Sequence, residues 1–267
     1  MPVSHGFLRA IRLLRDNVPA FDAYPFSIPS IAKLDELQLD PKVTFLVGEN
    51  GSGKSTLIEA IAVIAGFNAE GGTKNFKFGT RRSESQLHQF LRPVRGVKRP
   101  RDGFFLRAES YFNVATEIER LDEEPSLGPR IIDAYGGVSL HEQSHGESFL
   151  ALANHRFHGQ GLYILDEPEA ALSPQRQLSL LTIIHNLVEG SGSQFIIATH
   201  SPILMAYPNA MIYRLASEGI APIAYKDTEH YTITRDFLNS PERYFKTLFA
   251  NSSAHEDPDG GGPDRGS

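Results

Sequence analysis

The sequence contains no cysteine. Disulfide bonds, thiolate metal sites and cysteine nucleophiles are therefore excluded, and a reducing compartment suits the chain without being required. The sequence also lacks a long apolar run, because its best candidate, LIEAIAVIAGF, is too short and too interrupted to span a bilayer. The first residues, MPVSHGFLRAIRLLRD, have neither the apolar stretch nor the cleavage site of a signal peptide. We therefore expect a cytoplasmic protein that does not insert into membranes.

Basic charge is scarce outside one segment. The net charge is −6, but residues 74–107 contain ten basic and two acidic side chains, about +8, which leaves about −14 for the rest. Such a segment is either a solvated surface or a site for a polyanion, meaning nucleotide phosphates, nucleic acid or an acidic partner. Its basic residues are Lys74, Lys77, Arg81, Arg82, Arg92, Arg95, Lys98, Arg99, Arg101 and Arg107.

The apolar pattern predicts an α/β fold. With 267 residues, 40% of them apolar, the chain can bury a sizeable core. Strands are predicted at 7–14, 42–48, 75–80, 103–112, 161–167, 193–200, 210–216 and 220–226, and helices after Lys54 and at about 83–91, 146–156, 174–189 and 241–249. Several strands are continuously apolar, as in a mostly parallel sheet with helices on both faces. The tail, 251–267, is rich in Gly, Pro, Asp and Ser and is predicted to be disordered.

A glycine-rich loop follows the second predicted strand. The stretch GENGSGKST fits the pattern of the phosphate-binding loop, with a strand before it and a helix after it. The glycines let the backbone turn its N–H groups toward a phosphate, Lys54 can reach the β- and γ-phosphates, and the Ser55 hydroxyl can coordinate Mg²⁺. A turn that binds nothing is the alternative. The candidate nucleotide-binding residues are Gly48, Glu49, Asn50, Gly51, Ser52, Gly53, Lys54, Ser55 and Thr56.

Two later strands end in polar side chains. GLYILDE ends in Asp166 and Glu167, and Pro168 stops the strand. Asp166 can hold the Mg²⁺ shell while Glu167 faces the attacking water, although solvated acids at a strand end are the alternative. SQFIIATH ends in His200, which is either a structural histidine or a contact to the γ-phosphate or the water.

In motif order, residues 1–250 resemble the ATP-binding cassette ATPases. The resemblance is to the soluble branch that includes chromosome-maintenance and DNA-repair heads and ATPases labelled as AAA-family. Gly48 to Thr56 match the Walker A motif, Leu162 to Glu167 the Walker B motif, and His200 the switch histidine. The resemblance implies a single domain with a P-loop core, an antiparallel β part and a small helical lobe at about 70–157, with Lys54, Glu167 and His200 as catalytic residues.

The family's signature motif, LSGGQ or LSGGE, has a degenerate counterpart here. Gln143 to Glu147, QSHGE, stand in its place before a predicted helix. The resemblance implies that Ser144 and Gly146 grip the γ-phosphate of ATP bound to a second protomer, so that neither site is complete in a monomer. The helix N-terminus and the small side chains agree with this role. An ordinary capped helix start is the alternative.

Several positions depart from the family pattern or stay open. His145 replaces the first signature glycine, and Ser173 stands where relatives often carry the D-loop aspartate. The substitution at 173 weakens the usual polar link between protomers. The Q-loop residue is one of Gln86, Gln89 and Glu109, and the aromatic residue that stacks on adenine is one of Phe21, Tyr24 and Phe26.

The spacing excludes a long coiled-coil arm. About 90 residues separate Lys54 from Ser144, and they contain strand-like runs, Pro, Gly and basic residues rather than heptads. The basic segment lies within this interval, in the lobe that carries the signature or beside the ATP site. Its aromatic residues are expected in the core rather than as a base-stacking platform. They are Phe76, Phe78, Phe90, Phe104 and Phe105.

Three functions remain after this reading. The first is an ATPase whose ATP-driven dimerisation, as a homodimer, acts on a protein or nucleic acid. The second is the ATP-binding subunit of a membrane transporter. The third is a nucleotide-gated nucleic-acid-binding protein with little turnover, which the basic segment favours. A stand-alone small-molecule kinase fits less well, because no substrate pocket can be recognised.

Overall fold

The computed structural model describes residues 6–73, 85–107 and 145–250, together with isolated positions at 116, 120, 122, 130, 132–133 and 137. The chain divides into two compact units, Met1–Tyr225 and Lys226–Ser267. The prediction that residues 1–250 form one domain stays a prediction. The predicted strand at 75–80 and the tail at 251–267 lie outside the described residues.

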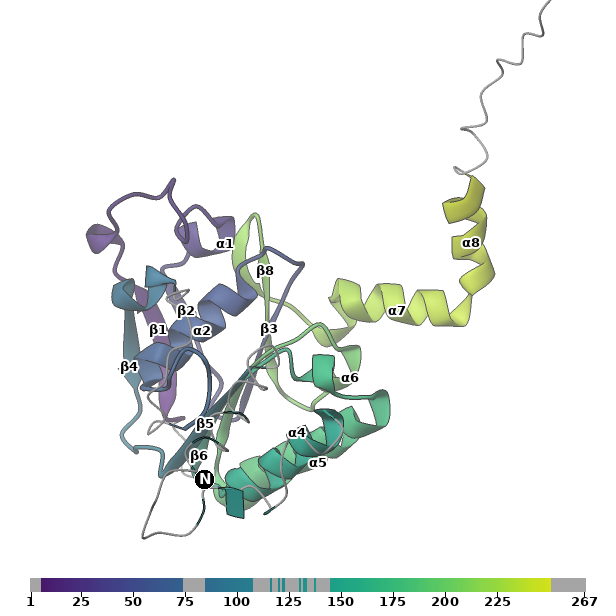
Figure 1. Cartoon of the computed structure of the whole chain (residues 1–267). Helices are drawn as coiled ribbons and strands as arrows, with labels where there is room; N and C mark the ends of the chain where they lie inside the picture. The colour runs from purple at the N-terminus through teal and green to yellow at the C-terminus, as the bar shows by residue number, and fades with distance from the viewer. Residues whose placement is uncertain are drawn as a thin grey trace, which may run out of the picture. The chain divides into compact units, whose positions relative to one another are not determined.

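A six-stranded sheet forms the centre of the first unit (Figure 1). Its order is β5-β6-β7-β3-β8-β9, and all neighbouring pairs are parallel except the β8–β9 hairpin. The strands are β3 (Val43–Val47), β5 (Asp102–Arg107), β6 (Gly161–Asp166), β7 (Gln194–Ala198), β8 (Met211–Ala216) and β9 (Gly219–Pro222). Every residue of β3, β6 and β7 is buried, as their continuous apolar runs predict for a sheet covered on both faces.

Alternate residues of each strand enter two different cores. On one face, Phe195 and Ile197 of β7 pack with α4 (His145–Arg156) and α5 (Pro174–Ser191). On the other face, Ile196 and Ala198 pack with α2 (Lys54–Ala65). Figure 1 shows α2 on one side of the sheet and the pair α4 and α5 on the other. The predicted α/β fold with helices on both faces is confirmed.

A second, antiparallel sheet lies over the α2 face. Its order is β2-β1-β4, with β1 at Leu8–Leu13, β2 at Glu36–Gln38 and β4 at Leu91–Arg95. Leu8, Ile11 and Leu13 of β1 join the core that contains α2. The fully buried Gln194 of β7 accepts a hydrogen bond from the Leu8 N–H and donates to the Leu8 carbonyl, at 2.9 and 2.8 Å. One side chain therefore links the two sheets.

Short helices complete the first unit. They are η1 (Arg15–Asn17), α1 (Pro29–Ala32), η2 (Gln86–Phe90), η4 (Pro168–Ala171) and α6 (Pro202–Met205), followed at the boundary by η5 (Tyr225–Asp227).

Within its described part, the helix predicted for residues 83–91 is a short 3₁₀ helix that ends before Leu91. Residues from Gln86 to Phe90 form a 3₁₀ turn, capped by the Ser85 hydroxyl, which accepts from the Leu87 N–H. From Leu91 the chain pairs with β1 instead. The strand predicted at 220–226 is also shorter than expected, since it ends at Pro222.

The second unit contains two amphipathic helices, α7 (Glu229–Asn239) and α8 (Pro241–Ala250). Thr228 caps α7 through its hydroxyl, and Pro241 is the first residue of α8. Phe237 of α7 contacts Tyr244 and Phe245 of α8 edge to face, with centroids 5.6 and 5.8 Å apart. The sequence predicts α8, whereas α7 was not predicted because its β-branched and aromatic residues give only a weak helical signal.

Candidate functional site

The glycine-rich loop joins β3 to α2, and hydrogen bonds connect its last residues to its first. Lys54, the first residue of α2, donates from Nζ to the carbonyl oxygens of Gly48 and Glu49, at 2.8 and 3.0 Å. Gly53 has a φ of +95°, and a Cβ at this position would lie 3.0 Å from Ile28 and from the Ser30 hydroxyl. That hydroxyl donates to the Ser52 carbonyl. A residue other than glycine at 53 would therefore be strained and crowded at once.

Lys54 lies close to three carboxylates. Its side chain is buried, and this burial lowers the pKa of the ammonium group. The charges of Glu167, Asp166 and Glu169 oppose the shift. The cationic end of the loop and the acids that follow β6 thus share one electrostatic environment.

Parallel strand order brings the three predicted motifs together. β7 lies between β6 and β3, so the strand that ends before His200 is flanked by the strand that ends at Asp166 and by the strand that ends before Gly48. The Thr199 N–H donates to Leu46 of β3, and the Glu167 N–H donates to Ala198 of β7, at 3.1 and 2.9 Å. This is the neighbour relationship expected from the sequence.

The turn after β6 aims two glutamates toward the turn after β7. Glu167 has a φ of +50°, an uncommon conformation for a residue other than glycine. The His200 Nε2 lies 3.4 Å from the Glu167 Oε1. Glu169, in η4, accepts a hydrogen bond on Oε1 from the His200 backbone N–H at 2.5 Å. A strained backbone supported by neighbouring contacts is a frequent feature of functional sites.

One arginine of the basic segment belongs to this site, and the sequence reading did not separate it from the rest. Arg107 ends β5, and its Nη1 forms a 2.6 Å ion pair with Glu59 of α2. Its Nε lies 3.4 Å from the Oδ2 of Asp166. Glu59 also accepts from the Ser85 N–H at 3.2 Å. The sequence offered no signal for this role, because the strand was predicted at 103–112 and Arg107 fell in its middle, whereas β5 ends at Arg107.

The signature region is only partly described. Gln143 and Ser144 lie outside the described residues, and α4 begins at His145. A Cβ on Gly146 would lie 2.5 Å from the Arg176 Nη1 and 2.9 Å from the Ala171 carbonyl oxygen. Gly146 therefore lets α4 approach the segment between η4 and α5 closely.

Ser173 acts as a helix cap in this chain. Its hydroxyl accepts from the Arg176 N–H at 3.4 Å, and Pro174 is the first residue of α5. One turn on, the buried Gln177 donates to the Leu172 carbonyl and accepts from the Ser201 hydroxyl. The segment after η4 is thus tied to the segment after β7.

The exposed fractions of the three candidate aromatic residues narrow the choice of the residue that stacks on adenine. Phe26 is 3% exposed and packs against Phe90 in the core, whereas Tyr24 is 66% exposed. The Tyr24 hydroxyl lies 3.4 Å from that of Thr56, beside the glycine-rich loop. Phe21 packs edge-on against Phe26 under the Arg15 guanidinium.

Of the Q-loop candidates, Gln86 and Gln89 are exposed in η2, and Glu109 lies outside the described residues. The described basic residues other than Arg107 are exposed on β4 or on the loop before β5. They are Arg92, Arg95, Lys98, Arg99 and Arg101. Phe104 and Phe105 are fully buried, as the sequence predicts, and Phe76 and Phe78 lie outside the described residues.

The donor set suits a magnesium ion that is shared with a phosphate. Ser55 supplies a hydroxyl at the start of α2, and Asp166 supplies a buried carboxylate at the end of β6. Mg²⁺ is usually held by one or two protein oxygens and keeps several waters or phosphate oxygens. In the part of the chain that the structure describes, no group of three or more histidine or acidic residues could hold a metal.

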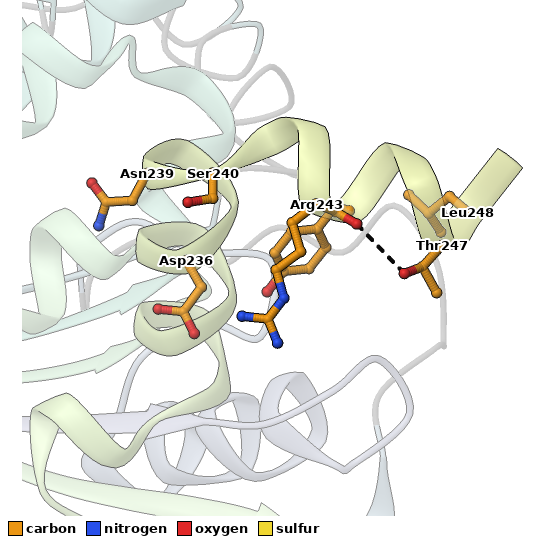
Figure 2. Close-up of a pocket in the computed structure, with 7 residues that line it drawn as sticks. Asp236, Asn239, Ser240, Arg243, Thr247 and Leu248 are labelled. Atoms are coloured by element: carbon orange, nitrogen blue, oxygen red, sulfur yellow. Dashed lines mark hydrogen bonds between the residues drawn. The ribbon is translucent and has the colours of Figure 1, made fainter. Parts of the chain in front are cut away.

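A separate pocket of about 460 Å³ lies within the second unit, between α7 and α8 (Figure 2). None of the predicted site residues lines it. Its lining residues are Asp236, Asn239, Ser240, Arg243, Tyr244, Thr247 and Leu248.

Two protein-family models match the chain. One, described as "AAA domain, putative AbiEii toxin, Type IV TA system", matches residues 91–206, and one described as "AAA domain" matches residues 27–119. Together they span the glycine-rich loop, β6 and β7. Residues 27–206 are therefore similar to ATPase domains of the AAA type.

Two curated proteins are similar to this ATPase. The tungstate uptake system ATP-binding protein TupC of Campylobacter jejuni is 24% identical over 83% of this chain and 74% of its own length. The DNA repair protein RecN of Halalkalibacterium halodurans is 27% identical over 58% of this chain. The alignment covers 31% of RecN, so the chain spans about a third of that relative.

Among solved structures, the SMC head domain from Thermotoga maritima is similar, with 18% identity and a TM-score of 0.43 over 81% of this chain and 99% of that one. Among its described residues, none of the helices has the length and apolarity needed to cross a lipid bilayer.

Proposed function

We propose that the ATPase binds ATP with Mg²⁺ through the glycine-rich loop and hydrolyses it, and that two copies bind each other when ATP is present. The observation that carries this proposal is the strand order β6-β7-β3, which places the loop, Asp166 and His200 at neighbouring strand ends. Carboxyl ends of parallel strands are where ligands bind in open α/β sheets.

Each group then has a defined task. Lys54 donates hydrogen bonds to the loop carbonyls, and it exchanges these bonds for the β- and γ-phosphate oxygens when ATP binds. Ser55 and Asp166 would hold the metal ion, which would neutralise charge on the phosphates. Glu167 orients the attacking water and takes its proton, with His200 beside it at 3.4 Å. Tyr24 is the residue that stacks on adenine, since its ring is exposed beside Thr56.

Dimerisation is proposed from the signature-like residues, since α4 begins at His145 and QSHGE, the degenerate counterpart of the signature motif, stands at its start. We assign Ser144 and Gly146 to the ATP bound by the partner copy, in a homodimer. The dimer acts on a protein or nucleic acid, and we place it in the cytoplasm.

The first test is the molecular mass of Glu167→Gln in solution with and without Mg-ATP. This variant keeps the phosphate contacts but lacks a carboxylate base, so it should bind ATP, turn over slowly and accumulate as a dimer. A monomer in both conditions would contradict the dimer. Hydrolysis at the wild-type rate would contradict the role of Glu167.

Similarity to TupC favours a second candidate, the ATP-binding subunit of a membrane transporter. The degenerate motif QSHGE and the use of Ser173 as a helix cap count against it. Purification of the tagged chain from its own cell in mild detergent discriminates between the two. Stoichiometric recovery of an integral membrane protein would support the transporter.

Five exposed basic side chains between Arg92 and Arg101 favour the third candidate, a nucleotide-gated nucleic-acid-binding protein. Contacts from these side chains to phosphates would make affinity fall steeply with salt. Fluorescence anisotropy with labelled DNA and RNA at 50 to 300 mM salt, with and without ATP, tests this. The absence of binding at the lowest salt removes the candidate.

A further inference from the structure

Glu169 is a partly buried acid that the mechanism above does not use. It lies three residues after Asp166, in η4, and PEAA around it forms the turn between β6 and α5. Its Oε1 accepts the backbone N–H of His200, which is 31 positions later in the sequence. Its own carbonyl accepts the Leu172 N–H at 3.0 Å. The residue therefore joins the turn after β6 to the turn after β7.

The hydrogen bond falls at the point where the backbone of His200 leaves the sheet. The preceding residue, Thr199, still donates its N–H to Leu46 of β3, and the following residue, Ser201, already caps α6. His200 is the one residue between these two anchors, and Glu169 accepts its N–H. The direction of the imidazole ring toward Glu167 depends on this backbone position.

We propose that Glu169 is a positioning residue, which fixes the backbone of His200 so that the imidazole stays beside Glu167 during ATP hydrolysis. The proposal rests on the proposed function for the roles of His200 and Glu167. It assigns to Glu169 the task of a hydrogen-bond acceptor and not that of a charge.

The surroundings of Glu169 favour the neutral form of its carboxyl group, which can still accept a hydrogen bond. Burial, with the like charge of Glu167 nearby, raises the pKa of this carboxyl, and the His200 N–H and the Thr199 hydroxyl act in the opposite direction. A neutral group that keeps the acceptor oxygen would do the same work. The two glutamates of the motif DEPE thus have different requirements, because Glu167 needs its negative charge to take a proton.

A second set of contacts already holds the two turns together. Gln177 bonds to the Leu172 carbonyl and to the Ser201 hydroxyl, at 3.1 and 2.5 Å. Removal of Glu169 should therefore leave the turns in place and free only the backbone of His200. This separation makes a specific test possible.

The test compares Glu169→Gln, Glu169→Leu and Glu167→Gln in the full chain. Glutamine keeps an acceptor oxygen at the same reach, so we expect Glu169→Gln to retain kcat within about threefold. Leucine has no acceptor, so Glu169→Leu should lower kcat by about 10- to 100-fold while KM for ATP and the affinity for a fluorescent ATP analogue stay unchanged. A Glu169→Gln variant as inactive as Glu167→Gln, or a fully active Glu169→Leu variant, would overturn the proposal.

A second measurement does not depend on hydrolysis. In spectra of histidine labelled with ¹⁵N, with His200 assigned from His200→Gln, Glu167→Gln should move the His200 side-chain signals in the wild-type background. In the Glu169→Leu background the same substitution should leave these signals in place, because the ring no longer lies beside residue 167. Equal movement in both backgrounds would refute the positioning role. If the wild-type chain hydrolyses no ATP, the proposed function fails while this measurement still decides the inference.

Discussion

Arg176 of α5 forms an ion pair with Glu147 of α4, with 2.9 Å between Nη2 and Oε1. The two residues occupy the first turns of their helices, so the start of α4, where the signature-like residues lie, is tied to the segment that follows η4. Arg176 also fills the space above Gly146. A change at the nucleotide-facing turn after β6 can therefore reach the beginning of α4 through a single side chain.

Arg176→Ala should lower ATP turnover clearly while it changes the free energy of unfolding only slightly. The two side chains are 32% and 59% exposed, so loss of the ion pair should cost about 1 kcal/mol or less of unfolding free energy. ATP turnover should fall severalfold, because the start of α4 loses its connection to the turn after β6. Lys42→Ala is the matched control, since its pair with Glu189 lies on the surface at 2.7 Å, at the opposite end of α5 from Arg176. Equal turnover in both variants would show that the ion pair carries no coupling.

Gly146→Ala should destabilise the start of α4. Its added methyl group would meet the Ala171 carbonyl at 2.9 Å, and a backbone atom cannot move aside as a side chain can. We expect a loss of about 1 to 3 kcal/mol, as in other overpacked sites. Gly190→Ala in α5 provides the opposite control, because a Cβ there has nothing within 4 Å and alanine favours helix by about 0.5 to 1 kcal/mol. Urea unfolding of the two variants measures both effects, and equal midpoints would contradict the packing argument.

Tyr24 should contribute to ATP affinity through its ring. Tyr24→Ala removes the exposed aromatic surface and should raise KM for ATP about 5- to 30-fold, which corresponds to about 1 to 2 kcal/mol of stacking. Tyr24→Phe keeps the ring and loses only a long 3.4 Å contact to Thr56, so its KM should stay within about twofold. Initial rates over a range of ATP concentrations test the pair. A normal KM in Tyr24→Ala would exclude this residue as the adenine contact.

The stability of the ATPase should show a pH dependence that originates at Glu169. Because the pKa of this carboxyl is raised by burial, the folded chain keeps the proton to a higher pH than the unfolded chain does. The corresponding stability is complete below the ordinary value of 4.5 and is lost as pH rises through the higher folded value. Relative to wild type, Glu169→Gln should therefore gain melting temperature between about pH 4 and pH 7.

Glu189→Gln supplies a control of opposite sign for this experiment. Its hydrogen bond to Lys42 lowers the pKa of the Glu189 carboxyl, so that contribution appears as pH rises. The variant should have a lower melting temperature than wild type above about pH 4.5, and this difference should shrink as pH falls below that value. Parallel curves for Glu169→Gln and wild type would mean that Glu169 is not buried in solution.

The parts of the site that the sequence predicts are those defined by strand ends. β3, β6 and β7 are continuously apolar, and each is followed directly by its polar residues, so both the sheet and the gathering of Lys54, Asp166 and His200 follow from pattern alone. The helix expected at 83–91 is reduced to a 3₁₀ helix at Gln86–Phe90, because pairing of Leu91 with Leu13 across the sheet outweighs local helical periodicity.

Contacts between segments that lie far apart in the sequence could not be predicted from the apolar pattern. The pairing of Arg107 with Glu59 depends on the distance between β5 and α2, which no local spacing encodes. Ser173 was read as a weakened link between protomers, and in the structure its hydroxyl caps α5. The choice of Tyr24 over Phe26 required the burial of each ring.

The position of β3 in the sheet also affects biosynthesis. β3 pairs only with β7 and β8 among the described strands, and both are made long after it. A nascent chain that stops before Gln194 contains the whole glycine-rich loop but lacks β7 and β8, the strands that pair with β3 just before the loop. Contacts of such high sequence separation form slowly and late. An unfinished chain on the ribosome should therefore be unable to bind ATP, and translation that ends early yields no partly active product that could compete for the nucleotide.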